Sequence, residues 1–266
     1  MKGARVLFAK WIMYLGAGMI AFVLGGCSAQ THSHGPAFRV FVVASSDPDH
    51  AAMIAQAEPF LAKMAVENHF ALTFTRDTGQ INEANLANCQ VFIQLHLAPF
   101  NLSPQQQKAL QGFIEGGHGW IGIHAAGLTG KQFLARGTPY WQWFQDLMGG
   151  IVYSPHPAIQ RGLVVLEDRD HPVTRNLPAS LEIRDEWYEF DSSPRPHVHV
   201  LARADESTYQ PNRPMGDHPM IWINEKYRRA LYIGIGHDPA ICADPVFAIL
   251  MQDAIRWAAS PATLGQ

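Results

Sequence analysis

The sequence predicts an α/β protein whose mainly parallel sheet is flanked by helices and followed by a strand-rich insertion. Three observations support this fold class. Short apolar runs alternate with amphipathic segments between residues 38 and 148. Asp-Pro or Ser-Pro pairs, which are typical of helix starts, follow two of these runs. After Gly150 the pattern changes to closely spaced strand-like runs.

The parallel part is expected to contain four strands of apolar and β-branched residues, at 38–44, 70–75, 91–96 and 120–123. Asp47-Pro48 and Ser103-Pro104 each open a helix, because a capping side chain precedes a proline in the first turn. A short aromatic helix is expected over residues 139–148, covering one side of the fourth strand's end.

The insertion is expected to supply further strands, at 151–153, 163–166, 198–201, 220–224 and 230–235. The turn at 225–228 predicts a hairpin between the last two. Asp244-Pro245 then opens a closing helix with an apolar inner face.

Residues 116–127 read as a helix end, a buried strand and a sharp turn. Gly116 and Gly117 supply positive backbone angles that close the helix. Small residues surround His124, so the segment resembles a nucleophile elbow that presents one side chain to a pocket. The alternative is a histidine whose ring is satisfied by backbone groups in a glycine-rich loop.

Three predicted strands end in histidine: His96, His124, and His237 with the adjacent Asp238. Ligands of open α/β sheets bind beyond the carboxyl ends of the parallel strands, so these side chains are expected to converge. Imidazole suits both proton transfer near neutral pH and metal ligation, and a nearby carboxylate would set its tautomer. The alternative is that each is a polar strand-end residue that meets solvent.

A second candidate group is Asp185-Glu186-Trp187-Tyr188. Adjacent carboxylates beside aromatic rings suit a sugar, whose ring face stacks on an aromatic and whose hydroxyls bond to carboxylates. His156, after a predicted strand, is a further pocket candidate. The alternative is a solvated surface loop. One shared pocket requires this segment to fold over the sheet edge, with a carboxylate near His124 or His237 and with Trp187 and Tyr188 as walls.

The amino-terminal residues predict a lipoprotein signal peptide at 1–26. Basic residues precede an apolar run, 11–24, that is shorter than the roughly 20 residues of a membrane-spanning helix, and Leu24-Gly25-Gly26-Cys27 follows. Cleavage before Cys27 and lipidation of its thiol would leave residues 27–36 as a tether. The alternative is an uncleaved anchor. Because Ser28 is not aspartate, the outer membrane or its periplasmic face is expected if the organism has two membranes.

Residues 37–260 are expected to form one domain. Removal of the signal takes three of the 20 basic residues and leaves 17 against 23 acidic ones, a balance that argues against nucleic acid as a partner. Cys89 and Cys242 are expected to be reduced and buried.

Several separated motifs resemble the trehalose-utilisation (ThuA-like) family in order: 116–126, 147–150, His156-Pro157, 170–174, 185–188, 219–222 and 230–238. The resemblance implies a fold similar to the class I glutamine amidotransferases, which is flavodoxin-like. His124 stands at the elbow where those enzymes carry cysteine, and His237-Asp238-Pro239 stands where they carry the triad histidine. Without a thiol at residue 124, glutaminase activity is not expected.

The family association with disaccharides, especially oxidised keto-sugars, implies that the envelope lipoprotein predicted from the leader acts on a disaccharide or keto-sugar derivative. His124, His237, Asp238 and Glu186 are the catalytic candidates, and the substrate-binding candidates are Asp185, Trp187, Tyr188, His96 and His156. A divalent metal such as zinc is the candidate cofactor, with His124, His156, His237 and Glu186 as candidate ligands. Two alternatives stay open: a non-catalytic sugar-binding lipoprotein and a metal-dependent hydrolase.

Overall fold

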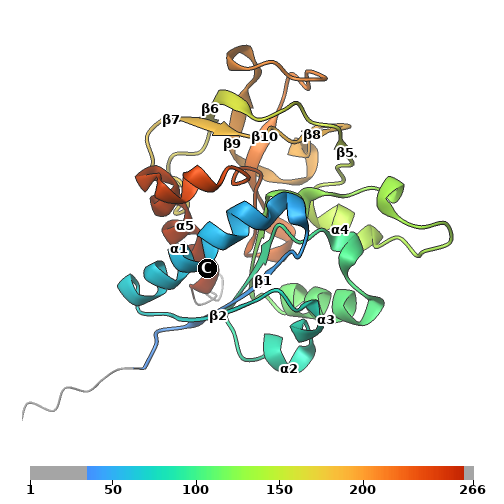
Figure 1. The fold of residues 1–266 in the computed structure, drawn as a ribbon, viewed down its shortest axis with the longest axis vertical. Coiled ribbons are helices and arrows are strands. Elements are labelled where there is room, and N and C mark those ends of the chain that lie inside the picture. Colours follow the sequence, from blue (N-terminus) through green and yellow to red (C-terminus); the bar gives the residue numbers. More distant parts are fainter. Residues whose placement is uncertain (1–34, 261–266) are drawn as a thin grey trace, which may run out of the picture. The chain divides into compact units, whose positions relative to one another are not determined.

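The computed structural model describes residues 35–260, which contain a nine-stranded sheet with helices on both faces (Figure 1). The strand order is β2-β1-β3-β4-β11-β10-β9-β6-β7. No helix within these residues is long and apolar enough to cross a membrane. The predicted signal at 1–26, Cys27 and most of the tether lie outside the described residues.

Half of the sheet is parallel, as predicted. Its strands are β1 (Arg39–Ala44), β2 (Ala71–Thr75), β3 (Val91–Leu95), β4 (Gly119–Ile123) and β11 (Ala230–Ile233). The first four agree with the predicted strands to within one residue at each end. Parallel pairing places the carboxyl ends of all five strands at one edge of the sheet.

The strand-rich part extends the same sheet in antiparallel pairs, through β10 (Pro219–Asn224), β9 (His199–Asp205), β6 (Gln160–Leu166) and β7 (Ser180–Asp185). The predicted hairpin joins β10 to β11. A separate pair consists of β5 (Tyr153–Ser154) and β8 (Glu189–Phe190). Strand β7 was not predicted, although its alternation of buried Leu181, Ile183 and Asp185 with exposed neighbours is typical of an edge strand.

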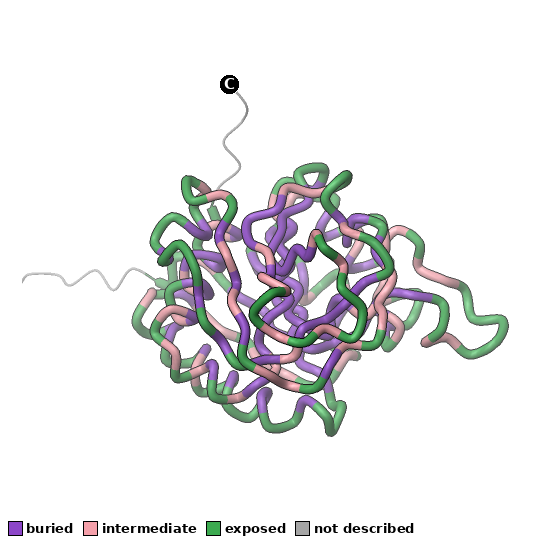
Figure 2. The backbone as a smooth tube through the Cα atoms, turned by 90° about the horizontal axis from the view of Figure 1, so that it is seen from above, coloured by how far each residue is buried: buried purple, intermediate pink, exposed green. Residues whose placement is uncertain are grey.

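The two faces of the sheet carry different helices. Val40 and Val42 of β1 face α1 (Ala51–Glu67) and α5 (Pro245–Ala259), whereas Phe41 and Val43 face the other side. That other side is covered by α2 (Glu83–Leu86), α3 (Pro104–Glu115) and α4 (Gln142–Leu147). Figure 1 shows α1 and α5 together, away from α3 and α4, and Figure 2 shows the buried backbone running through the centre.

The predicted helix starts have the expected caps. Ser103 forms a capping box with Gln106 at the start of α3, and Asp244 accepts from the Val246 N–H (2.7 Å) at the start of α5. Asp47 instead caps a short 3-10 helix, Pro48–His50, which leads into α1. The expectation for Gly116 was wrong, because its φ is −68° and Gly117 alone takes the left-handed angle, +82°.

Both described cysteines are free. Cys89 is buried as predicted, at 3% exposure. The predicted burial of Cys242 is only partly right, because this residue is partly exposed in the 3-10 helix Pro239–Ala243, where its Sγ lies 3.8 Å from Met53 Sδ. Exposed and buried residues mix in this segment before α5, where Ile241 is buried and Ala240 and Ala243 are exposed.

Candidate active site at the carboxyl edge of the sheet

The chain turns sharply at His124, directly after β4. His124 has a φ of +50°, which side chains other than glycine adopt rarely, and a 3-10 helix follows over His124–Gly127. The buried Tyr232 hydroxyl donates to the His124 carbonyl oxygen (2.8 Å) and holds the turn. A Cβ on Gly127 would overlap the Tyr232 ring and hydroxyl. The sharp turn expected from the small residues is therefore present.

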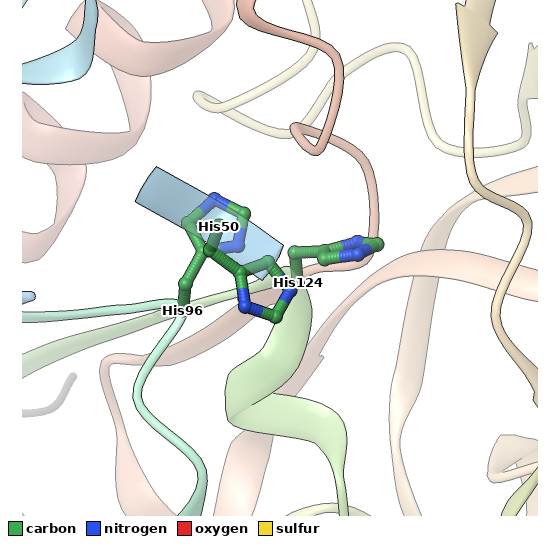
Figure 3. Close-up of side chains that lie close together, drawn as sticks. All are labelled: His50, His96 and His124. Atoms are coloured by element: carbon green, nitrogen blue, oxygen red, sulfur yellow. The ribbon is translucent and has the colours of Figure 1, made fainter. Parts of the chain in front are cut away.

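Four histidines gather at this edge of the sheet. His50 follows β1, His96 follows β3 with a φ of +51°, His124 follows β4 and His237 follows β11. The ring centroid of His50 lies 4.7 Å from that of His96 and 5.2 Å from that of His237. The His124 centroid lies 5.2 Å from both His96 and His237. Figure 3 shows the rings of His50, His96 and His124 side by side on three separate segments.

His50 was missed at the sequence level. The rule that selected His96, His124 and His237 also applies to β1, since the chain turns at Asp47-Pro48 just beyond that strand. His50 is the last residue of the 3-10 helix there, and it is 7% exposed. His50 was overlooked because it does not directly follow the predicted strand; several residues separate it from the end of β1.

Glu186 connects three imidazoles. Its Oε2 lies 3.2 Å from His124 Nε2, 3.1 Å from His237 Nδ1 and 3.4 Å from His156 Nε2. Glu186 follows β7, so the far edge of the sheet reaches back over the ends of the parallel strands. The candidates His124, His156, His237 and Glu186 therefore lie together, as a single pocket requires.

The electrostatics of this group are strongly perturbed. Burial would raise the pKa of Glu186, but His124 and His237 lower it, and the net shift is far below the ordinary carboxyl value. Burial would lower the pKa of His237, but the nearby Glu186 carboxylate raises it above the ordinary imidazole value. Burial, reinforced by His124 and His237, lowers the pKa of His50 to about 4. Burial likewise holds the pKa of His96 well below its usual range.

Asp185 does not have the substrate-binding role that was predicted. It is fully buried, and its carboxylate accepts from the backbone N–H groups of Gly236, His237 and Asp238 at 2.5–3.1 Å. These bonds hold the loop that carries His237. The residue is a positioning residue, because extended backbone turns adjacent side chains to opposite sides and only Glu186 faces the imidazoles.

Asp238 likewise has structural partners. Its Oδ1 accepts from the Ala240 N–H (3.0 Å) and caps the 3-10 helix that follows, while its Oδ2 pairs with Arg184. The carboxylate that meets His237 is Glu186. The prediction of Asp238 as a catalytic group is therefore not supported by its position.

The two aromatic candidates separate. Trp187 is fully buried, stacks on Tyr209 at 4.6 Å and donates from Nε1 to the Gln160 carbonyl (3.1 Å), so it belongs to the core and the predicted wall role was wrong. Tyr188 packs against His124, with centroids 3.9 Å apart, and against His156 at 4.9 Å. Tyr188 therefore forms part of the packing around these two imidazoles.

The cluster has a closed side and an open side. His50, His96 and His124 are 7%, 1% and 0% exposed. The side chains of Glu186, His156 and His237 retain 15%, 21% and 14% exposure. A ligand from solvent therefore meets Glu186, His156 and His237 first. Within residues 35–260, His50, His96 and His124 form one group able to hold a metal ion, and His124, Glu186 and His237 form another.

A family model described as trehalose utilisation, ThuA, matches residues 39–258. The chain belongs to the ThuA family. A ThuA-like protein of known structure from Bacteroides uniformis is 29% identical, with a TM-score of 0.76 over 86% of this chain and 94% of that one. Another, from Parabacteroides merdae, is 15% identical, with a TM-score of 0.63 over 85% and 90%. A search of curated proteins finds no match.

The fold of this ThuA chain is also similar to those of glutamine amidotransferases. PurLQS from Thermotoga maritima is 14% identical, with a TM-score of 0.51 over 84% of this chain and 99% of that one. The glutaminase domain of CTPS from Trypanosoma brucei is 10% identical, with a TM-score of 0.52 over 84% and 94%. At these identities the likeness concerns the fold alone, and it confirms the predicted class I glutamine amidotransferase-like fold.

Proposed function

We propose that this ThuA protein is a carbohydrate-processing enzyme that acts on a disaccharide or a keto-sugar derivative by proton transfer, without glutaminase activity. The observation that carries the proposal is the position of Glu186, whose Oε2 lies within 3.1–3.4 Å of the imidazoles of His124, His156 and His237. The family description of trehalose utilisation supports a sugar as the substrate class.

The geometry suits general acid–base chemistry. A carboxylate and imidazoles that share one small site provide a proton acceptor and a proton donor a few ångströms apart. His237 is held by the loop that Asp185 fixes, and His124 is held by its turn, so the groups are preorganised. We assign His237 and Glu186 to proton transfer with the substrate, and His156 to substrate hydroxyls at the rim.

Glutaminase chemistry requires a nucleophile at the elbow, where this chain has His124. Of the described cysteines, Cys89 is buried near the far end of β3 and Cys242 lies before α5. Burial raises the pKa of both thiols, to about 12 and about 11, which disfavours the thiolate form. Glutamine is therefore not the expected substrate.

The test is a screen of disaccharides and their keto forms with the purified protein, in which sugar consumption is followed by chromatography and mass spectrometry. We expect turnover that His237→Ala reduces by roughly 100- to 10,000-fold. The exposed His197, outside the cluster, provides the control variant His197→Ala, which should retain activity. Binding of a sugar without any consumption would favour the non-catalytic sugar-binding alternative and overturn the enzyme.

We also propose a location in the cell envelope, through a lipid anchor at Cys27. The support is the leader sequence, with its basic start, short apolar run and Leu24-Gly25-Gly26-Cys27. Cys27→Ser should abolish incorporation of labelled fatty acid. An unmodified, full-length amino terminus found by mass spectrometry of the native protein would contradict the anchor.

A further inference from the structure

We propose that His50, His96 and His124 bind one divalent transition-metal ion of the zinc class. The three residues follow three different parallel strands, and one ligand atom of each lies within 4.8 Å of the others. Figure 3 shows the three side chains close together, each on a different segment. The proposal concerns the closed side of the cluster, and it does not depend on which sugar, if any, is turned over.

The inner imidazoles are poorly supplied with hydrogen-bond partners. Neither buried ring nitrogen of His96 makes a well-aligned hydrogen bond to a described residue, although the Gly236 backbone lies close to the ring, and buried Nδ1 of His50 has no partner among the described residues. A buried polar atom left without a partner costs about 1–3 kcal/mol, so natural cores rarely keep several together. A metal ion would accept one lone pair from each ring and so satisfy one nitrogen of each.

His124 has the hydrogen-bond pattern of a metal ligand. Its Nδ1 lies 2.8 Å from the Gly234 carbonyl oxygen, which can only accept, so Nδ1 carries the proton and Nε2 presents a lone pair when the ring is neutral. This arrangement is typical of metal-binding histidines, whose second nitrogen donates to a backbone carbonyl. Nε2 faces Oε2 of Glu186 at 3.2 Å, and two acceptors at this distance need a proton or a cation beside them.

The rim supports the same conclusion. Nδ1 of His156 lies 2.8 Å from the Pro157 carbonyl, so its Nε2 also turns a lone pair toward Glu186 when the ring is neutral. Glu186 and the buried Asp185 supply negative charge close to the inner histidines.

The ligand chemistry selects the metal class. Three neutral imidazoles with a carboxylate nearby suit zinc and its first-row neighbours, whereas magnesium and calcium prefer oxygen ligands. Tetrahedral zinc with bonds of about 2.0–2.1 Å keeps its nitrogens about 3.3 Å apart, so ligand atoms within 4.8 Å of one another must approach by up to about 1.5 Å to bind. Three histidines leave one coordination position, which would face the open side, where Glu186 lies.

The test uses the purified protein after treatment with a chelator. Zinc titration by calorimetry should show saturable binding of one ion per chain, and cobalt should give visible ligand-field absorption that zinc abolishes. Magnesium and calcium in large excess should not compete. His50→Gln and His96→Gln should each weaken zinc binding by more than the roughly 10- to 100-fold that outer partners account for.

Controls separate this site from other zinc binders. His197→Ala, at an exposed histidine, should bind zinc as the wild type does. His32→Ala with His34→Ala removes two tether histidines and should leave the cobalt spectrum unchanged. If zinc binding is lost in Glu186→Gln and His237→Gln but kept in His50→Gln and His96→Gln, the ion belongs to the outer group and the proposal is wrong.

A variant that fails to fold does not end the test, because the wild-type protein provides a second readout. Zinc at hundredfold excess over its Kd should raise Tm by roughly 5–10 °C, and the chelator should reverse the rise. The absence of saturable binding together with an unchanged Tm would overturn the site. Failure of the sugar screen would leave it standing, since neither readout measures turnover.

Discussion

Two clusters of charged and polar groups lie beside the same sheet, and they differ in how completely hydrogen-bond donors are paired with acceptors. Around Arg195, the guanidinium meets Glu167 at 2.7 Å and Asp217 at 2.6 Å, and Ser193 donates to the same Asp217 carboxylate. Donors face acceptors throughout, and the Arg195 side chain is 42% exposed. At the carboxyl edge of the parallel strands, buried imidazole nitrogens lack partners within residues 35–260, and one carboxylate faces three rings.

Complete pairing of donors with acceptors around Arg195 is typical of an ion-pair network that stabilises the fold. Incomplete pairing of buried groups is typical of a site that binds a ligand. A surface network of this kind forms where oppositely charged side chains meet, and each ion pair contributes little to stability. A mismatched buried cluster is costly, and it persists where a bound species or a reaction uses the unpaired groups. Substitutions in the mismatched cluster should therefore have larger effects than substitutions around Arg195.

Glu186→Gln should reduce turnover by roughly 100- to 10,000-fold, because an amide keeps the shape of the carboxylate but cannot take a proton. The measurement is the steady-state rate on a sugar found by the screen. Glu182→Gln is the matched control on β7, since Glu182 forms an exposed pair with Arg161 at 3.3 Å. Equal losses in the two variants would remove the distinction between the clusters.

Asp185→Asn should lower the free energy of unfolding by about 1–3 kcal/mol, because one acceptor oxygen is lost where three backbone N–H groups point. The loop that carries His237 should loosen, so turnover should also fall. Urea denaturation measures the first effect. Asp170→Asn, at an exposed aspartate, should leave stability unchanged; a similar loss there would show that the three bonds are not responsible.

Arg195→Ala should lower the free energy of unfolding by about 1 kcal/mol or less, because the ion pairs are partly exposed and screened by solvent. Added salt should weaken the wild type toward the variant. Chemical denaturation at low and high ionic strength provides the comparison. A loss of stability as large as that of Asp185→Asn, independent of salt, would show that solvent does not screen the Arg195 ion pairs and would contradict this prediction.

The smallest expected effect is the pH dependence of the same network. Hydrogen bonding from Arg195 holds the pKa of Asp217 below its ordinary value of 3.8, with burial opposing. A depressed folded pKa stabilises the fold above the unfolded value, and this contribution is lost as pH falls through the folded pKa. The difference in free energy of unfolding between wild type and Arg195→Ala should thus be largest near neutral pH and should shrink below about pH 4. A difference that grows in acid would contradict the sign.

The parallel half of the sheet was readable from the sequence because its signals are local. Apolar runs mark β1, β2, β3 and β4, and caps such as Ser103 mark helix starts. The strand-end rule then selected His96, His124 and His237 without knowledge of the strand order, since all parallel strands end at one edge. The lipid anchor at Cys27 stays a prediction.

Only the tertiary structure decided which of these groups share a site. Asp185 and Glu186 are neighbours in sequence, yet one fixes a loop and the other meets three imidazoles, because β7 reaches the parallel strand ends only through the order of the antiparallel strands. Packing also buries Trp187 against Tyr209, and the pairing of β1 with β3 brings His50 beside His96. Local periodicity specifies which residues alternate, but the packing of distant strands determines what each face of an edge strand touches.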